Sequence, residues 1–367
     1  MMRERGTTAG DARDDDPLLR VENLRTTFAT ETGTVRAVDG VSFDVERGET
    51  VGLVGESGAG KSVTARSLVG LVEDPGRVVG GSVRLDGAEL TDNTEAEWRD
   101  VRGGRIAMVF QDPLSRLNPV YTVGNQIEEA LRIHRGLRGA AAREKAVELL
   151  EDVGIPDAAR RAEAYPHEFS GGMCQRAVIA VALACDPDLL VCDEPTTALD
   201  VTIQAQILDL LDDLRAERDL AVLFITHDMG VVAEVCDRVN VMYAGEIVER
   251  AGVVDLFERP KHPYTQGLLD AVPARTARGE RLATIEGEVP TPTEPATACR
   301  FAPRCPRAFD ACHSVHPTGV AVSAGADDHT AACLHYPADA AQDDAVERHR
   351  ERDGSANADA DAEGGAE

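Results

Sequence analysis

One glycine-rich segment constrains the fold of this chain more than any other part of the sequence. It directly follows a continuous apolar run, Thr50–Val54, which is typical of a buried strand in an α/β sheet. The segment reads Gly55-Glu56-Ser57-Gly58-Ala59-Gly60-Lys61-Ser62 and matches the pattern G-x-x-x-x-G-K-[ST]. Its glycines let backbone N–H groups turn inward around phosphate oxygens, and the N-terminus of the helix that follows adds positive potential. The sequence therefore predicts an α/β fold with a phosphate loop between a strand and a helix.

The last two residues of this loop have specific chemistry in the same pattern. Lys61 would reach the β- and γ-phosphates of a nucleotide, and the Ser62 hydroxyl would bind Mg²⁺. A chance match in a glycine-rich loop is the alternative. The predicted strand before the segment and the predicted helix after it are the context that the motif requires, and they argue against chance.

A second apolar run, Leu189–Cys192, ends in two carboxylates. Asp193 suits Mg²⁺, directly or through water, and Glu194 is placed to polarise an attacking water. The alternative is a surface Asp-Glu pair at the end of a strand. Because a phosphate loop precedes this run in the same chain, we favour the catalytic interpretation.

The rest of the central region alternates between strand and helix patterns. Helical spacing of apolar residues dominates between Gln111 and Phe169, for example over Val123–Arg135 and Ala140–Val153, which predicts a helical subdomain at about 112–169. Further strand-like runs flank this region at Leu18–Phe28, Val41–Val45, Arg105–Phe110, Ala221–Thr226, Val239–Tyr243 and Glu246–Glu249. No internal repeat is present, so we expect one nucleotide-binding core.

A third motif, Ser170-Gly171-Gly172, lies before a long apolar helix, Gln175–Cys185. Serine at a helix N-cap, followed by two glycines, offers a hydroxyl and free N–H groups to an anion. Taken alone, this pattern would indicate an ordinary capped helix.

Together the three motifs resemble the ATP-binding subunits of ABC transporters, over about residues 17–258. In this resemblance Gln111 matches the Q-loop, His227 the switch histidine and Asp200 the D-loop. It implies that two such domains pack head to tail, with ATP between the phosphate loop of one and Ser170-Gly171-Gly172 of the other. Gln111 would contact Mg²⁺ and the attacking water, His227 the γ-phosphate, and Asp200 the dimer interface. Phe28 is the candidate to stack on adenine, although Ala29–Thr34 resembles an insertion.

Further motifs resemble those of one subfamily, the oligopeptide/dipeptide importers. Phe169 and Met173 flank the Ser-Gly-Gly motif as in one of the two ATPases of those importers, and His262-Pro263-Tyr264-Thr265 and Glu286–Pro290 match as well. The resemblance implies a peptide importer in which this chain pairs with a paralogous ATPase beneath two permeases, fed by an extracellular binding protein. Nickel and sugar importers share these motifs, and a soluble ABC ATPase of DNA repair or translation is the alternative from another class.

Four cysteines lie in the Pro-rich segment 259–337, which we predict to be a small separate module. Cys299, Cys305, Cys312 and Cys333 have the spacing C-x5-C-x6-C-x20-C, which contains no C-x-x-C pair and does not favour zinc. Four thiolates in such a segment suit an iron–sulfur cluster, while zinc, disulfides and free thiols stay open. The subfamily resemblance implies a [4Fe–4S] cluster. Cys174, Cys185, Cys192 and Cys236 are isolated in predicted helices or strands and are interpreted as small core residues.

The two ends of the chain are polar. Residues 1–16 are rich in Asp and Gly, and residues 338–367 contain mainly Asp, Glu, Ala and Gly, so we expect both segments to be disordered. The longest apolar run, Ala177–Cys185, is far shorter than the ~20 residues that a membrane-spanning helix needs. Together with the absence of a signal-peptide pattern, this predicts a cytosolic chain, and the resemblance implies peripheral attachment to the cytoplasmic face of the membrane.

The charge of the chain excludes one class of partner and indicates a habitat. There are 65 acidic and 38 basic residues, a formal net charge of −27, and Lys61, Lys145 and Lys261 are the only lysines. A nucleic-acid-binding surface needs a positive field, so no nucleic-acid partner is expected. This composition is typical of a protein from a salt-rich cytoplasm, where carboxylates hold water and cations and salt screens their repulsion. An acidic protein from a GC-rich genome is the alternative.

Overall fold

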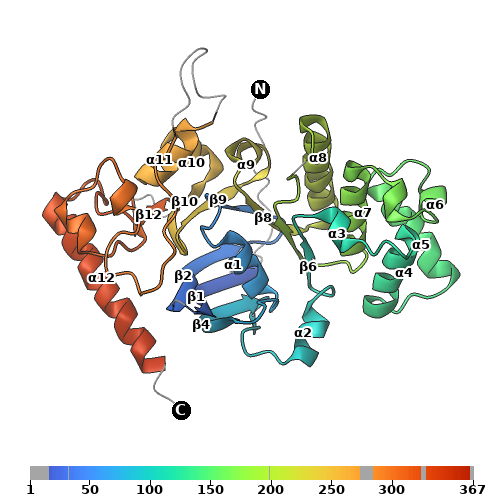
Figure 1. Ribbon diagram of the computed structural model, residues 1–367, viewed down its shortest axis with the longest axis horizontal. Coiled ribbons are helices and arrows are strands. Elements are labelled where there is room, and N and C mark those ends of the chain that lie inside the picture. Colours follow the sequence, from blue (N-terminus) through green and yellow to red (C-terminus); the bar gives the residue numbers. More distant parts are fainter. Residues whose placement is uncertain (1–15, 32, 198, 273–283, 324–327, 364–367) are drawn as a thin grey trace.

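The computed structural model describes residues 16–31, 33–197, 199–272, 284–323 and 328–363, and of helix residues 353–363 only the backbone. Apart from Asp16, the tail predicted at residues 1–16 lies outside this range. The described chain is built around two sheets, with helices packed against the larger one (Figure 1). This arrangement confirms the predicted α/β fold.

The larger sheet has eight strands in the order β11-β12-β10-β9-β3-β8-β7-β6. Strands β9, β3, β8, β7 and β6 run parallel, and β10 pairs with β9 in the antiparallel sense. The parallel strands are short apolar runs that are almost wholly buried, as expected for a sheet that is covered on both faces. The bounds of the parallel strands and of β10 are Thr50–Val54 (β3), Ile106–Val109 (β6), Leu189–Asp193 (β7), Ala221–Thr226 (β8), Arg238–Tyr243 (β9) and Glu246–Gly252 (β10).

The smaller sheet is antiparallel, with the order β2-β1-β4-β5. Strands β1 and β2 form a hairpin, so the segment Ala29–Thr34, which resembles an insertion in the sequence, contains its turn. The sequence did not indicate β4, because its glycines weaken the strand pattern. The bounds are Leu19–Thr30 (β1), Gly33–Val45 (β2), Gly76–Leu85 (β4) and Ala88–Glu89 (β5).

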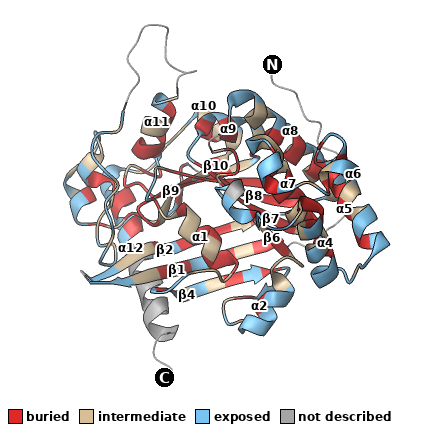
Figure 2. Cartoon of the chain, turned by 45° about the vertical axis from the view of Figure 1, so that its right-hand side comes forward, coloured by how far each residue is buried: buried red, intermediate tan, exposed pale blue. Residues whose placement is uncertain are grey.

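Two apolar cores lie on opposite faces of the larger sheet. The strands between them are largely buried (Figure 2). One core joins the smaller sheet and helix α1, Lys61–Leu68, to one face through residues such as Leu19, Leu53 and Leu68. The other core joins the helices to the opposite face through residues such as Val109 and Phe224. The phosphate loop between β3 and α1 is therefore anchored to a rigid frame on both sides.

The segment between β6 and β7 is helical, and its two longest predicted helices are present. Thr122 caps α4 by accepting from the N–H of Asn125 at 3.2 Å, and Ser170 caps α7 by accepting from the N–H of Met173 at 3.3 Å. The apolar faces of α4 and α5 pack with α7 into the core on this side of the sheet. The bounds are Pro113–Arg116 (α3), Val123–His134 (α4), Ala140–Asp152 (α5), Ala158–Arg161 (α6), Pro166–Glu168 (η1) and Gly171–Leu183 (α7).

Four further helices connect the remaining strands. Helix α2 (Glu95–Val101) precedes β6, α8 (Val201–Arg218) joins β7 to β8, α9 (Met229–Val235) joins β8 to β9, and α10 (Val253–Glu258) follows β10. No helix within the described ranges combines the length and the apolar character that are needed to cross a membrane.

The region after residue 258 is less separate from the core than the sequence indicates. Its strand β12, Thr330–Ala331, pairs with β10 of the core, and β11, Val320–Ala321, pairs with β12, so both extend the larger sheet. In the sequence between β10 and β11 lie α11 (Pro263–Asp270), η3 (Ala302–Arg304) and η4 (Asp310–His313). Strand β12 covers an edge of β10 that would otherwise be unpaired, and β11 adds one further strand. This pairing joins the C-terminal region to the core.

The prediction that residues 338–367 are disordered is wrong for most of that segment. Residues Gln342–Glu363 form helix α12. Val346 packs with Ala302, Cys312 and Leu334 in a small separate core, and His349 is fully buried. Tertiary packing thus stabilises a segment whose composition alone indicates a solvated tail.

Candidate functional site

The phosphate loop takes a backbone path that requires glycine. Gly60, at the N-cap of α1, has φ = 107°, and a Cβ at this position would lie 2.2 Å from the carbonyl oxygen of Ala37. A Cβ at Gly55 would lie equally close to the carbonyl oxygen of Met242. The loop is therefore packed against β2 and β9, and larger residues at these glycines would displace it.

Lys61 folds back over the loop. Its Nζ donates to the carbonyl oxygens of Gly55 at 2.8 Å and of Glu56 at 3.0 Å, and its side chain is buried. Burial lowers the pKa of Lys61, while the carboxylates of Glu194 and Asp193 act against this shift. The ammonium group thus lies over the phosphate loop, in electrostatic contact with the two carboxylates at the end of β7.

Ser62 and Asp193 meet at the base of the loop. The Ser62 hydroxyl donates to Asp193 Oδ1 at 2.9 Å, across 131 positions of sequence. Burial raises the pKa of Asp193, and the hydrogen bond from Ser62 opposes it. A hydroxyl and a carboxylate beside a phosphate loop are the ligands that a nucleotide-bound Mg²⁺ takes in P-loop proteins, so these two residues fit that ion.

Glu194 receives hydrogen bonds from three side chains. Gln111 Nε2 donates to Glu194 Oε2 at 2.9 Å, and the Thr197 hydroxyl donates to the same oxygen at 3.1 Å. His227 Nδ1 lies 3.1 Å from Glu194 Oε1. The structure thus brings together the three predicted catalytic residues, and it adds Thr197, which sequence analysis did not single out.

Three predicted residues have other surroundings. Ser170 is exposed at the start of α7, and Asp200 is exposed at the N-cap of α8, where its carboxylate accepts from the N–H groups of Thr202 and Ile203 at 3.1 and 3.0 Å. Phe28, in β1, is half-buried against Gly76 of β4. The structure therefore does not bring these three described residues into the site around the phosphate loop.

Of the four cysteines of the C-terminal region, Cys299 and Cys305 flank η3, Cys312 lies in η4 and Cys333 follows β12. The N–H of Cys299 donates to the carbonyl oxygen of Cys312 at 3.0 Å, and burial raises the pKa of both Cys299 and Cys333 to about 12. Within the described part of the chain, no group of three or more His, Cys, Asp and Glu side chains is arranged to hold a metal ion. The structure therefore does not show an assembled site for the predicted [4Fe–4S] cluster or for zinc among the described residues.

Two residues beyond the core also reach the phosphate loop. Tyr264 and Arg304 both hydrogen-bond to Glu56. The motif that contains Tyr264 has a recognisable sequence pattern, but nothing in the sequence indicates that it contacts a loop more than 200 positions earlier. Arg304 carries no sequence signal of its own.

A phosphate loop, an acidic strand end, a glutamine and a histidine arranged in this fold define an ABC-type ATPase. Comparisons with known proteins agree: the family described as "ABC transporter" matches residues 38–197, and the family described as "Oligopeptide/dipeptide transporter, C-terminal region" matches residues 248–312.

Curated relatives match almost the whole chain. The probable peptide ABC transporter ATP-binding protein y4tR of Sinorhizobium fredii is 54% identical over 87% of this chain and 95% of its own length. The oligopeptide transport ATP-binding protein AppD of Bacillus subtilis is 48% identical over 89% and 98%, and the dipeptide transport ATP-binding protein DppD of Escherichia coli is 47% identical over 88% and 97%.

A solved structure shares the fold of the core. A dimeric post-hydrolysis state of the ATP-binding cassette MJ0796, bound to ADP and Pi, matches 64% of this chain and 98% of that chain, with 28% identity and a TM-score of 0.58. The chain therefore belongs to the ATP-binding proteins of the peptide ABC transporter family. The resemblance seen in the sequence is confirmed, and with it the expectation that the chain is an ATPase.

Proposed function

We propose that this ATPase energises the import of dipeptides or oligopeptides. The observation that carries the proposal is the C-terminal match at residues 248–312, together with the peptide-transport names of relatives that align over 95% or more of their length. Nickel and sugar importers are the alternative cargoes. In cells that lack this gene, uptake of labelled di- and tripeptides should fall, while uptake of nickel and of labelled disaccharides should be unchanged. The reverse pattern would reject the peptide assignment.

We further propose a role for each residue around the phosphate loop. The backbone of Gly55–Gly60 and Lys61 bind the phosphates of ATP, and Ser62 and Asp193 hold Mg²⁺, with Gln111 as a further ligand. Bound Mg²⁺ would neutralise the charge that develops on the phosphate oxygens. Support comes from the 2.9 Å contact between Ser62 and Asp193 and from the position of Lys61 over the loop.

Hydrolysis needs a base, and Glu194 is the candidate. Its carboxylate lies at the end of β7, and it would accept a proton from the attacking water. Gln111 and His227 contact it from two sides, which suits the positioning of a water molecule and the sensing of the γ-phosphate. Phe28 is proposed to stack on adenine, and its only support is its place at the end of β1, upstream of the loop.

A second ATPase would complete the site. Ser170, Gly171 and Gly172 lie at the exposed start of α7, where their hydroxyl and N–H groups could bind the γ-phosphate held by a partner. Asp200 would lie at the interface of the two chains. We propose that the partner is a paralogous ATPase. Purification through a tag on this chain should recover two different ATPases, and recovery of a self-dimer alone would contradict the proposal.

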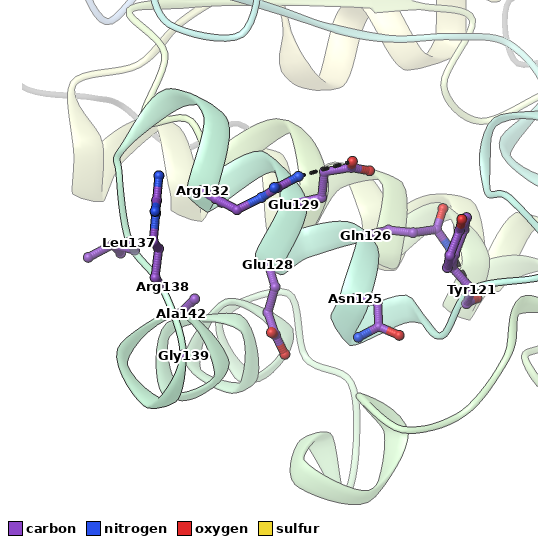
Figure 3. A pocket seen from close by; sticks show the side chains of 10 residues that line it. All are labelled: Tyr121, Asn125, Gln126, Glu128, Glu129, Arg132, Leu137, Arg138, Gly139 and Ala142. Atoms are coloured by element: carbon purple, nitrogen blue, oxygen red, sulfur yellow. Dashed lines mark hydrogen bonds and ion pairs between the residues drawn. The ribbon is translucent and has the colours of Figure 1, made fainter.

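Attachment to two permeases is proposed through the helical region 112–169. Its outer surface carries exposed apolar side chains at Val120, Tyr121 and Ile133. Beside them lies a groove, shown in Figure 3, that is lined by residues of α4, α5 and the adjoining loops: Tyr121, Asn125, Gln126, Glu128, Glu129, Arg132, Leu137, Arg138, Gly139 and Ala142. Exposed apolar groups beside a groove are typical of a protein interface.

These partners would hold the chain at the cytoplasmic face of the membrane, with a solute-binding protein acting outside the cell. The alternative of a soluble ATPase in DNA repair or translation is disfavoured by the net charge of −27, which opposes binding to nucleic acid. We also propose that the protein works in a salt-rich cytoplasm, where salt screens the repulsion among its carboxylates.

We also propose a [4Fe–4S] cluster at Cys299, Cys305, Cys312 and Cys333, with zinc as the alternative. Two observations support it. The thiols are close enough for Cys312 and Cys333 each to raise the pKa of Cys299, and backbone N–H groups hydrogen-bond to Cys299, Cys305 and Cys333 and oppose the rise in their pKa values. Such hydrogen bonds to sulfur tune iron–sulfur centres.

The metal proposal is tested by analysis of the protein purified without oxygen. It should be brown and hold about four irons per chain. Cys305→Ser should bleach it and leave ATP binding intact. Colourless protein with one zinc ion would change the metal, and metal-free protein with four alkylatable thiols would reject the site.

A further inference from the structure

The phosphate loop is tied to the C-terminal region by an ion pair. Arg304 Nη1 donates to Glu56 Oε2 at 2.8 Å, and Arg304 Nη2 donates to Glu56 Oε1 at 3.1 Å. The pair is bidentate and joins residues 248 positions apart. Bidentate arginine–carboxylate pairs fix geometry as well as charge. Glu56 is the second residue of the phosphate loop, so this contact acts directly on the nucleotide site.

The guanidinium of Arg304 is itself held rigidly. Its side chain is only 7% exposed, and it lies 5.7 Å from the ring centroid of Tyr243 and 6.0 Å from that of Phe301. The guanidinium also donates to the carbonyl oxygens of Ile285, Glu286 and Gly287. Because these partners come from several segments, Arg304 holds Glu56 from a fixed position.

A second residue of the C-terminal region binds the backbone of Glu56. The fully buried Tyr264 accepts a hydrogen bond at its Oη from the N–H of Glu56 at 2.8 Å. The carbonyl oxygen of Glu56 accepts from Lys61 Nζ at 3.0 Å. The N–H and the carboxylate of Glu56 are thus both bound by the region after residue 258, and its carbonyl is bound by the lysine of the phosphate loop.

We propose that Arg304 and Tyr264 are positioning residues for ATP, which fix Glu56 and thereby hold the phosphate loop in its nucleotide-binding form. The loop binds phosphate through backbone N–H groups, whose directions depend on dihedral angles that its glycines leave free. Fixing Glu56 removes part of the ordering cost of binding. Arg304 also neutralises a carboxylate close to the negatively charged phosphates of the ligand. This inference concerns the ATPase itself and is independent of the transported solute and of the partners.

The test measures ATP affinity in the full-length chain. A fluorescent ATP analogue is displaced by a non-hydrolysable ATP analogue in the presence of Mg²⁺, at a temperature well below the melting temperature of every variant. Arg304→Gln should weaken binding by about fivefold or more, the lower range of coupling between two sites. The KM for ATP should rise by a similar factor and kcat should change by less than about twofold, because uniform binding energy is lost.

Tyr264→Phe separates position from charge. It removes one hydroxyl acceptor and leaves every charge in place, so weaker ATP binding in this variant identifies the positioning effect. If Arg304→Gln does not fold, Arg304→Lys keeps the charge and loses the bidentate geometry, and it should bind ATP with intermediate affinity.

Arg300→Gln is the matched control. Arg300 is another buried arginine of the same segment, with 9% side-chain exposure, but it pairs with Asp39 and with the carbonyl oxygen of Ala244 at 2.7 Å, and not with the phosphate loop. The Arg300→Gln variant should have a lower melting temperature than the parent protein and the same ATP affinity. Unchanged ATP affinity in folded Arg304 and Tyr264 variants, or an equal loss in Arg300→Gln, would overturn the proposal.

Discussion

At the scale of single residues, Glu194 stands out in both backbone and charge. Its φ of 49° is left-handed, a conformation that non-glycine residues seldom adopt, and its N–H donates to the carbonyl oxygen of Ile225 at 2.9 Å. Burial acts to raise the pKa of Glu194, but hydrogen bonds from His227 and Thr197 outweigh it, and the pKa is lowered. The carboxylate is therefore ionised at neutral pH, as a general base must be. Such backbone strain is concentrated at functional sites.

Replacing this carboxylate gives the first prediction. Glu194→Gln keeps the size of the side chain and one acceptor oxygen, but it loses the charge and the basicity. ATP should bind as tightly as in the parent protein, while the turnover of the assembled transporter falls by ~10²-fold or more, the range expected for lost general-base chemistry. Steady-state phosphate release and ATP binding are the two measurements. Turnover close to that of the parent would reject Glu194 as the base.

The residues of this site differ in how far the sequence reveals them. Lys61, Ser62, Asp193 and Glu194 were predictable because they belong to short motifs that directly follow apolar strands, so local pattern and position agree. Arg304 could not be predicted, because its role depends on packing between segments 248 positions apart. Thr197 lay close to a motif, but a hydroxyl in a polar turn has many ordinary roles.

At the scale of elements, helix α11 begins at a buried histidine. His262 is the N-cap residue, and its Nδ1 accepts from the N–H of Tyr264 at 3.1 Å. Burial lowers the pKa of His262 to about 4, although the carboxylate of Glu249 acts in the opposite direction. In the unfolded chain the pKa of histidine is about 6.5. Between these two values the unfolded state binds more protons than the folded state, so stability falls as pH falls.

The second prediction follows from this difference. His262→Asn keeps a side-chain acceptor at the N-cap and does not titrate. The parent protein should be more stable than this variant above pH ~6.5, and its advantage should shrink by up to about 3 kcal/mol as pH falls from 6.5 to 4. Urea unfolding at a series of pH values measures the difference in the free energy of unfolding between the parent protein and the variant. His313→Asn, at an exposed histidine, is the control measured in the same series. A constant difference for His262→Asn would contradict the prediction.

Helix α12 gives the third prediction. His349 is fully buried, its Nδ1 accepts from the N–H of Thr318 at 3.1 Å, and its Nε2 therefore donates to the carbonyl oxygen of Tyr336 at 3.1 Å. His349→Ala leaves both backbone groups without this partner and should lower the free energy of unfolding by about 2 kcal/mol. Arg348→Ala, at an exposed position of the same helix, should change it by less than about 0.5 kcal/mol. Equal effects of the two variants would show that α12 does not pack as described.

This helix also shows why the sequence prediction of the tail failed. Its composition is strongly acidic, which argues for disorder when only the average is considered. Ala345, Val346 and His349 nevertheless share one helical face, and that face is buried. A single turn of apolar spacing is too short to identify from sequence, because the surface that it covers is formed by segments that lie elsewhere in the chain.

At the scale of the whole molecule, charge is the dominant feature. Cations are few and mostly arginine, and they are used in close pairs, such as Arg238 with Asp44 at 2.7 Å and with Glu49 at 2.6 Å. The excess of carboxylates produces a net charge of −27. On α8 the exposed residues Asp209, Asp213 and Glu217 recur every fourth position, which places like charges on one helical face. Such rows destabilise a helix when salt does not screen them.

The fourth prediction is therefore a strong dependence of stability on salt. The Debye length falls from ~30 Å at 0.01 M to ~3 Å at 1 M, so repulsion among the carboxylates is largely removed in molar KCl. The melting temperature should rise steeply over this range. A variant with Asp209→Asn, Asp213→Asn and Glu217→Gln should gain stability in dilute buffer and show a smaller rise with KCl, because three of the repelling charges are gone. If the melting temperature does not change with salt, the acidic composition is attributed to a GC-rich genome. If the melting temperature rises equally with KCl in the parent and in the variant, repulsion along α8 is excluded as the cause of the salt dependence.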